Sequence, residues 1–186
     1  MILNIPTILT LLRIASIPVI MVVFYLPIED ARLWCSLLFI AASLTDWFDG
    51  FLARRLNLQT AFGEFLDPVA DKLMVVTILV LIVQADPAVY IAIPAAIIIG
   101  REVSVASLRE WMAELGQRSV VKVSWVGKCK TGFQMLSIVC LLFNMDLYGV
   151  PIRTLGLVSI YIAAVLTLWS MWQYIQLALP GFKNNS

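Results

Sequence analysis

Four aspartates, Asp46, Asp49, Asp67 and Asp71, lie at regular spacing in a chain that is otherwise largely apolar. The first two are three residues apart and the last two are four apart, so each pair shares one face of a helix. The polar stretch 54–63 between the pairs can turn the chain back, and two antiparallel helices would then present two carboxylates each across a narrow gap. Anions this close cannot all stay ionised unless a cation lies among them.

The simplest cation for such a group is one or two hard divalent ions, most simply Mg²⁺. The absence of His and Cys from the set argues against Zn²⁺. Gly50 and Gly63 would let a bulky ligand approach the backbone, and Arg54 offers a planar donor fork suited to phosphate oxygens. Spacing alone leaves two other interpretations open: a proton or cation relay in a small transporter, and carboxylates that merely cap helices.

The chain contains no histidine, which excludes several classes of chemistry. A His-assisted Ser or Cys nucleophile, a His metal ligand, a histidine phospho-relay and a phospholipase-D-like lipid synthase all require that side chain. The cysteines Cys35, Cys129 and Cys140 have no metal-like spacing and are interpreted as packing residues. The net charge of +1 gives no indication of nucleic acid binding, and none is expected.

The composition predicts an all-α membrane protein. Hydrophobic residues make up 61% of the 186 positions and charged residues only 13%, and no linker marks a domain boundary, so 1–186 is expected to be a single integral membrane domain. Six stretches have the roughly 20 mainly apolar residues that a transmembrane helix needs. These predicted spans are Thr7–Leu26, Leu33–Ala53, Ala61–Gln84, Ala88–Leu108, Trp125–Phe143 and Leu155–Leu177.

The basic residues predict the orientation of these spans. One set of connections holds most of them, and it should face the cytosol: Arg54, Arg55, Arg109, Arg118, Lys122, Lys128, Lys130 and Lys183. Both termini and the turn between the aspartate pairs are therefore expected to be cytoplasmic, and the N-terminal residues are expected to begin the first span without being removed. Ionisable residues inside spans tend to face a polar cavity, which is expected here on the cytosolic side.

The aspartate segment fits the pattern D-x2-D-G-x2-A-R-x8-G-x3-D-x3-D at every fixed position. The fixed residues are Asp46, Asp49, Gly50, Ala53, Arg54, Gly63, Asp67 and Asp71. This pattern resembles the signature of the CDP-alcohol phosphatidyltransferase family, and eight fixed positions make a chance match very unusual. The stretches NIPTILTLLRI, REVSVASLREWMAELG and VSWVGKCKT extend the likeness, to the bacterial branch whose acceptor is sn-glycerol 3-phosphate.

The resemblance implies a homodimeric enzyme with six transmembrane helices, in the bacterial inner (cytoplasmic) membrane, with its site facing the cytosol. Such an enzyme transfers the phosphatidyl group of CDP-diacylglycerol to sn-glycerol 3-phosphate, giving phosphatidylglycerophosphate and CMP. Asp46, Asp49, Asp67 and Asp71 would hold two Mg²⁺ ions, for which Mn²⁺ could substitute, and Asp71 would also be the general base. The CDP side of the pocket would consist of Gly50, Ala53, Arg54 and Gly63.

The acceptor phosphate needs cations of its own, and the resemblance places them at Arg101, Arg109, Lys128 and Lys130. Alternatively, the two lysines could simply mark the cytosolic side, and Arg101 could form an internal ion pair with the adjacent Glu102. The basic cluster does not by itself separate glycerol phosphate from inositol phosphate. A sister transferase using inositol phosphate or phosphatidylglycerol therefore remains the alternative, followed by a cation or proton transporter.

Overall fold

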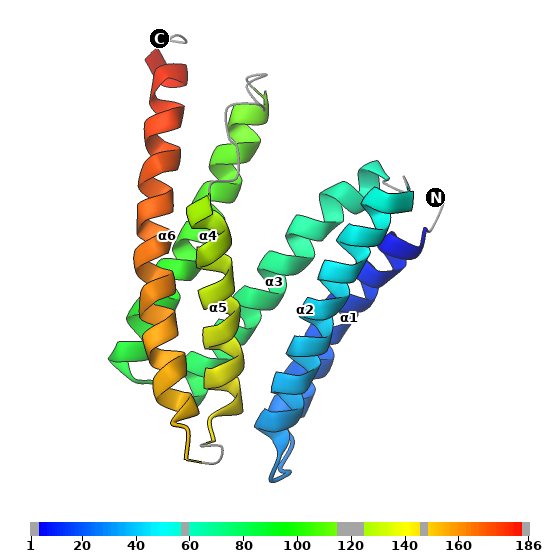
Figure 1. The fold of residues 1–186 in the computed structure, drawn as a ribbon, viewed down its shortest axis with the longest axis vertical. Helices are drawn as coiled ribbons and strands as arrows, with labels where there is room; N and C mark the ends of the chain where they lie inside the picture. The colour runs from blue at the N-terminus through cyan, green and yellow to red at the C-terminus, as the bar shows by residue number, and fades with distance from the viewer. Residues whose placement is uncertain (1–3, 57–59, 115–124, 146–148, 184–186) are drawn as a thin grey trace. The chain divides into compact units, whose positions relative to one another are not determined.

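The computed structural model consists entirely of α-helices in the part of the chain that it describes, which is residues 4–56, 60–114, 125–145 and 149–183. The helices follow one another with short connections (Figure 1). They are α1 (Ile5–Tyr25), α2 (Ala31–Leu56), α3 (Ala61–Ala85), α4 (Val89–Glu114), α5 (Trp125–Phe143) and α6 (Ile152–Lys183).

Each of the six predicted spans is confirmed as a helix. Prolines mark several boundaries: Pro27 follows α1, Pro87 precedes α4, and Pro151 precedes α6, as expected for a residue that lacks the backbone N–H. Two helices run several residues further than predicted, α4 to Glu114 and α6 to Lys183. The prediction followed apolar side chains only, whereas backbone hydrogen bonds continue a helix through polar residues as well.

Three helices are long and apolar enough to cross a membrane, over Thr7–Tyr25, Val89–Met112 and Ile152–Gln176. They carry large apolar side chains on their outer surfaces, such as Leu12 (59% exposed) and Val165 (65% exposed). Such exposure suits contact with lipid tails and not with water. The protein is therefore an all-helical protein of the multi-pass membrane type, and the remaining three spans stay predictions.

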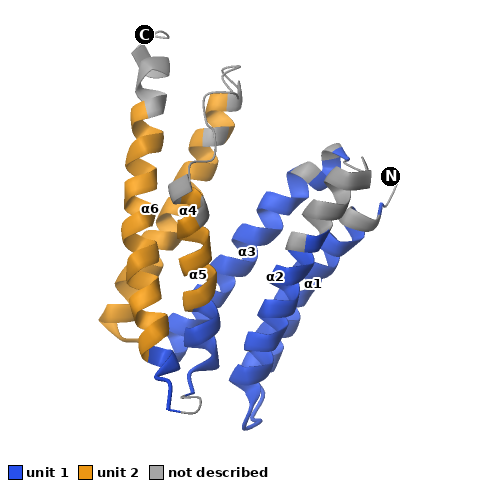
Figure 2. Ribbon diagram, in the orientation of Figure 1, with its two compact units in different colours: residues 1–85, 138–153 blue, residues 86–137, 154–186 orange. Residues whose placement is uncertain are grey.

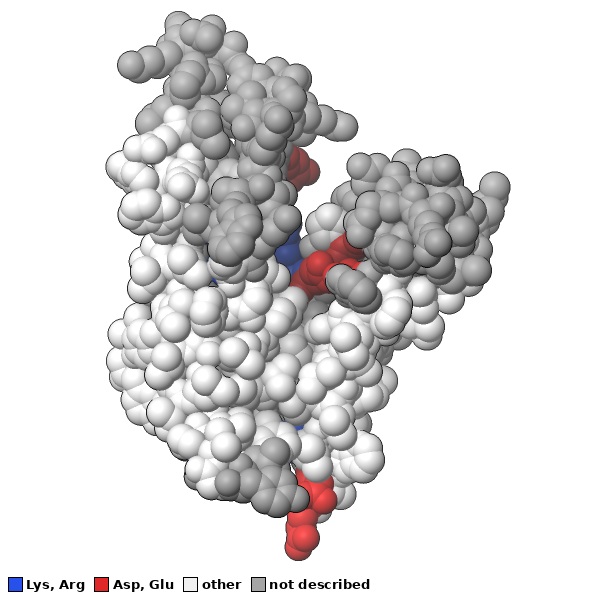
Figure 3. All heavy atoms as spheres, viewed as in Figure 1, with Lys and Arg blue, Asp and Glu red and all other residues white. Residues whose placement is uncertain are grey.

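The distribution of charge on the surface agrees with a protein of the membrane type. On the face shown in Figure 3, uncharged residues cover most of the described area. Acidic side chains stand out at the lower tip, where the connection from α1 to α2 carries the exposed residues Glu29 and Asp30. One group of charged residues thus lies at a helix connection, as expected where a chain leaves an apolar layer.

The helices divide between two compact units (Figure 2). Unit 1 comprises residues 1–85 and 138–153. In it α1 packs against both α2 and α3, and the core includes Ile20 of α1, Phe39 of α2 and Ile78 of α3, none more than 1% exposed. The free cysteines Cys35 and Cys140 are buried there too, which confirms that they are packing residues.

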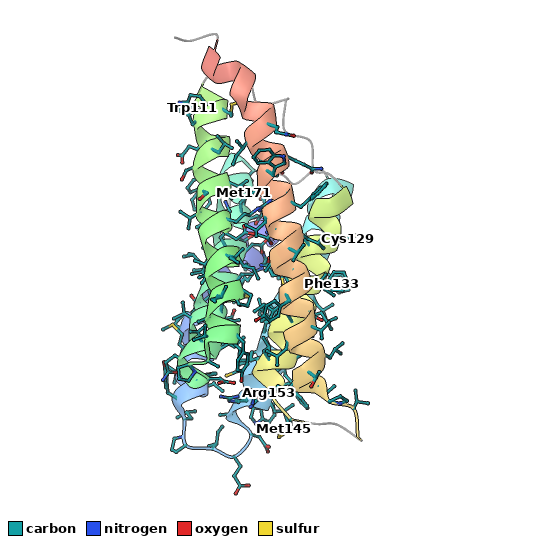
Figure 4. All side chains as sticks on the ribbon, turned by 90° about the vertical axis from the view of Figure 1, so that its left-hand side faces the viewer. Trp111, Cys129, Phe133, Met145, Arg153 and Met171 are labelled. Atoms are coloured by element: carbon teal, nitrogen blue, oxygen red, sulfur yellow. The ribbon has the colours of Figure 1, made fainter. Side chains whose placement is uncertain are left out.

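Unit 2 comprises residues 86–137 and 154–186, which include α4, the first part of α5 and most of α6. Its apolar core includes Ile98 of α4 and Ile160 of α6, both fully buried. Figure 4 shows these helices with their side chains, including Trp111 on α4, Cys129 and Phe133 on α5, and Met171 on α6. The prediction of one domain over 1–186 stays a prediction.

Candidate functional site

A buried arginine joins two of the predicted carboxylates in unit 1. Arg13 lies in α1 with only 1% of its side chain exposed, while the side chains of Asp46 and Asp71 are 38% and 45% exposed. One guanidinium nitrogen, Nη1, lies 2.5 Å from Oδ1 of Asp46 and 2.9 Å from Oδ1 of Asp71. The carboxylates of α2 and α3 thus lie close together, as the spacing of the aspartates predicted, and the cation between them is an arginine of α1.

The third described aspartate is held by a hydroxyl from the same helix. Thr10 donates a hydrogen bond of 2.5 Å to Oδ1 of Asp67. Thr7, Thr10 and Arg13 recur every three residues, so they share one face of α1, and all three are buried. This polar face of α1 fixes the aspartates of α2 and α3 in place.

The start of α3 is tied to the same face. Thr60 directly precedes α3, and its hydroxyl accepts a 3.0 Å hydrogen bond from the backbone N–H of Gly63, as a helix N-cap does. The hydroxyls of Thr60 and Thr7 also share a 3.3 Å hydrogen bond. A Cβ at Gly63 would lie 3.1 Å from the Thr60 hydroxyl and 3.3 Å from that of Thr7. A side chain at position 63 would therefore crowd both hydroxyls where α3 lies against α1.

A second buried charged group lies inside unit 2. Glu102 of α4 forms an ion pair with Lys130 of α5, and its Oε1 also accepts a 3.3 Å hydrogen bond from Nη1 of Arg101. Arg101 in turn donates a 3.2 Å hydrogen bond to Ser170 of α6 and lies 5.5 Å from the ring centre of Tyr174. The internal ion pair considered for Arg101 is confirmed. Two basic side chains thus contact the same carboxylate.

The polar interior of unit 2 continues beyond these charges. Lys130, Gln134 and Ser137 follow one face of α5, and Thr167 and Ser170 follow one face of α6; all five are buried. Among the described side chains, Oε1 of Gln134 and Oγ1 of Thr167 have no hydrogen-bond partner. Buried polar side chains thus line the interior of unit 2 on both α5 and α6.

The donor set of unit 1 fits a hard divalent cation in its chemistry. Asp46, Asp67 and Asp71 supply only carboxylate oxygens, which Mg²⁺ and Mn²⁺ prefer, and two of them already meet at one point. Within the described residues, no three acidic or sulfur-bearing side chains are grouped closely enough to hold a metal ion by themselves. Arg13 lies between two of the candidate ligands.

The remaining predicted site residues have side chains that the structure does not describe. The side chains concerned are those of Asp49, Gly50, Ala53, Arg54, Arg109 and Lys128. The structure also adds residues that sequence reasoning missed, namely Arg13 and Thr10, which contact the aspartates directly. Arg13 is the only Lys, Arg, Asp or Glu in the sequence of the predicted span Thr7–Leu26, and that isolation was a usable signal.

Comparison with known proteins gives consistent matches. The model of the family described as CDP-alcohol phosphatidyltransferase matches residues 3–169, which cover parts of both units. A Sodalis glossinidius protein named CDP-diacylglycerol--glycerol-3-phosphate 3-phosphatidyltransferase is 53% identical over 176 residues, 95% of each chain. Proteins of the same name from Pectobacterium atrosepticum and Yersinia pseudotuberculosis are 52% identical over 175 residues (94% of each chain) and 54% identical over 176 (95% of each).

Proposed function

Because this chain belongs to the CDP-alcohol phosphatidyltransferase family, we propose that it transfers the phosphatidyl group of CDP-diacylglycerol to sn-glycerol 3-phosphate. The products are phosphatidylglycerophosphate and CMP. The observation that carries this assignment is the similarity, over nearly the whole chain, to proteins named for that reaction. The described aspartates, which converge on one face of α1, support it independently.

The carboxylates of unit 1 bind the donor through divalent cations. Asp46, Asp49, Asp67 and Asp71 would hold two Mg²⁺ ions, or Mn²⁺ in their place. When bound, these ions would supply positive charge to neutralise the diphosphate and the charge that develops on departing CMP. Thr10 and Arg13 orient three of these ligands from α1.

Asp71 acts as the general base. Its carboxylate is half exposed, so an acceptor hydroxyl can reach it, and Arg13 holds it from the buried side. A positioned base of this kind contributes roughly 10²–10⁴-fold to the rate. The CDP part of the donor lies against Gly50, Ala53, Arg54 and Gly63; Gly50 leaves room for close approach to the backbone, and Arg54 supplies a planar fork.

The acceptor phosphate binds to the basic residues Arg101, Arg109, Lys128 and Lys130. The buried group around Glu102 supports this, because Lys130 and Arg101 lie together there and contact the same carboxylate. Glu102 holds both basic side chains in fixed orientations. A neutral alcohol would gain nothing from this arrangement.

The protein spans the bacterial inner membrane six times, with both termini and a polar active-site cavity on the cytosolic side, as a single domain that forms a homodimer. The distribution of Lys and Arg supports the orientation, and the three long apolar helices support the membrane location. The bacterial origin of the similar proteins supports the choice of membrane.

The test is an acceptor panel. Purified protein in detergent is given CDP-diacylglycerol and Mg²⁺ with glycerol 3-phosphate, inositol phosphate or phosphatidylglycerol, and CMP release is followed. Glycerol 3-phosphate should be preferred by kcat/KM, and a chelator should abolish turnover. Preference for another alcohol would overturn the acceptor assignment, and cation or proton flux into proteoliposomes without CMP release would instead favour a transporter.

A further inference from the structure

We propose that Arg13 competes with divalent cations for Asp46 and Asp71, and so sets how tightly the metal centre holds its ions. The inference rests on the metal centre proposed above and concerns a residue outside the aspartate signature. In this role Arg13 is a positioning residue, because it contacts the ligands and not the substrates. Its guanidinium already occupies the point where the two carboxylates meet.

The contacts explain the competition. A single nitrogen of Arg13 binds Oδ1 of both aspartates, at 2.5 Å and 2.9 Å, so one positive group satisfies two anions. A divalent ion bound by the same carboxylates would lie within a few ångströms of the guanidinium, where like charges repel. Either the cation takes the two oxygens and Arg13 gives up hydrogen bonds, or they share the oxygens at a cost in repulsion.

Burial makes Arg13 the fixed partner in this competition. Its side chain is 1% exposed on the α1 side, whereas the two carboxylates are 38% and 45% exposed. Cations can therefore approach the aspartates from their open side, but Arg13 cannot leave for solvent without breaking the packing of α1. Nor can it lose its proton, since a guanidinium stays charged in proteins. Its opposition to the metal is therefore permanent.

Linkage gives the sign of the effect. If Arg13 and the metal weaken each other's hold on the carboxylates, removing one must strengthen the binding of the other by the same factor. Without Arg13, two neighbouring carboxylates would repel each other until a cation binds, so the protein would depend on the metal for stability. Binding by the metal would become tighter, and stability without metal would fall.

The experiment measures Mn²⁺ binding by electron paramagnetic resonance, on the full chain in detergent. Arg13→Gln removes the charge, and Arg32→Gln is the matched control, because Arg32 also lies in unit 1 but faces the ring of Phe24 at 6.0 Å. We expect Arg13→Gln to bind Mn²⁺ about tenfold more tightly than wild type. The control should bind like wild type. Thermal unfolding with and without Mn²⁺ should show a larger stabilisation by Mn²⁺ in Arg13→Gln.

The outcomes separate the inference from the function on which it rests. Unchanged or weaker Mn²⁺ binding in Arg13→Gln overturns the competition, even if the variant is less stable, because a purely structural arginine would lower stability equally with and without metal. If wild-type binding of Mn²⁺ is insensitive to Asp71→Asn, the metal centre itself is wrong. Should Arg13→Gln not fold, Arg13→Lys decides: a point charge serves two carboxylates less well, so binding should tighten about threefold, and no change overturns the proposal.

Discussion

The buried charges of unit 2 make a sharp prediction about stability. The side chains of Glu102, Lys130 and Arg101 are 15%, 4% and 10% exposed, so water screens them little. Glu102→Gln keeps the shape but removes the negative charge that Lys130 and Arg101 both contact. Removing one partner of a buried pair costs about 3–5 kcal/mol, and we expect about 3 kcal/mol because glutamine keeps one acceptor oxygen. For a chain of this length the Tm should fall by about 6–12 °C.

A double variant tests the cause. Lys130→Met in the Glu102→Gln background removes the surplus cation, and the Tm should recover by about half of the loss. Thermal unfolding in detergent measures both, and Glu110→Gln, at an exposed position of the same helix, should leave the Tm within about 1 °C. A Glu102→Gln variant as stable as this control, or a double variant less stable than the single one, would refute the argument from buried charge.

Three further variants test unit 1. Asp71→Asn should lower the rate of CMP release by about 10²-fold or more while its thermal unfolding stays near that of the wild type. Near-normal turnover in this variant would refute the assignment of Asp71 as the general base. Thr10→Val should raise the Mg²⁺ concentration for half-maximal activity several-fold, with kcat at saturating Mg²⁺ little changed, because Asp67 loses its hydroxyl donor; equal Mg²⁺ requirements would contradict this. Gly63→Ala should lower the Tm because its Cβ crowds two hydroxyls, whereas Gly132→Ala, with open space around it, should be neutral or stabilising by up to about 1 kcal/mol. Equal Tm values for the two glycine variants would argue against the crowding.

The helices were predictable because their signal is local. Apolar runs of about 20 residues, interrupted near Pro27, Pro87 and Pro151, located all six. The spacing within each aspartate pair is also a local signal, and it predicted which helix face carries the carboxylates. The structure brings Asp46 and Asp71 together, as that spacing suggested. Such features depend on residues within one or two turns of each other.

The partners of these aspartates were not predictable in the same way. Arg13 contacts Asp71 across 58 residues of sequence, and only the packing of α1 on α3 creates that contact. In the sequence Thr10 looks like any threonine of an apolar helix, because its hydrogen bond to Asp67 forms only when α3 packs against α1. Likewise, Glu102 was expected beside Arg101, but its pairing with Lys130 depends on how α5 packs against α4.

The buried cation of α1 has a consequence for biosynthesis. In the order of synthesis Arg13 precedes both of its partners, Asp46 on α2 and, 58 positions later than Arg13, Asp71 on α3. During that interval the newly inserted segment carries a charge that costs about 2.5–3.5 kcal/mol at the centre of a bilayer. Assembly of α1 therefore depends on the arrival of its partners on α2 and α3, and stalling translation before Asp46 should leave α1 poorly anchored.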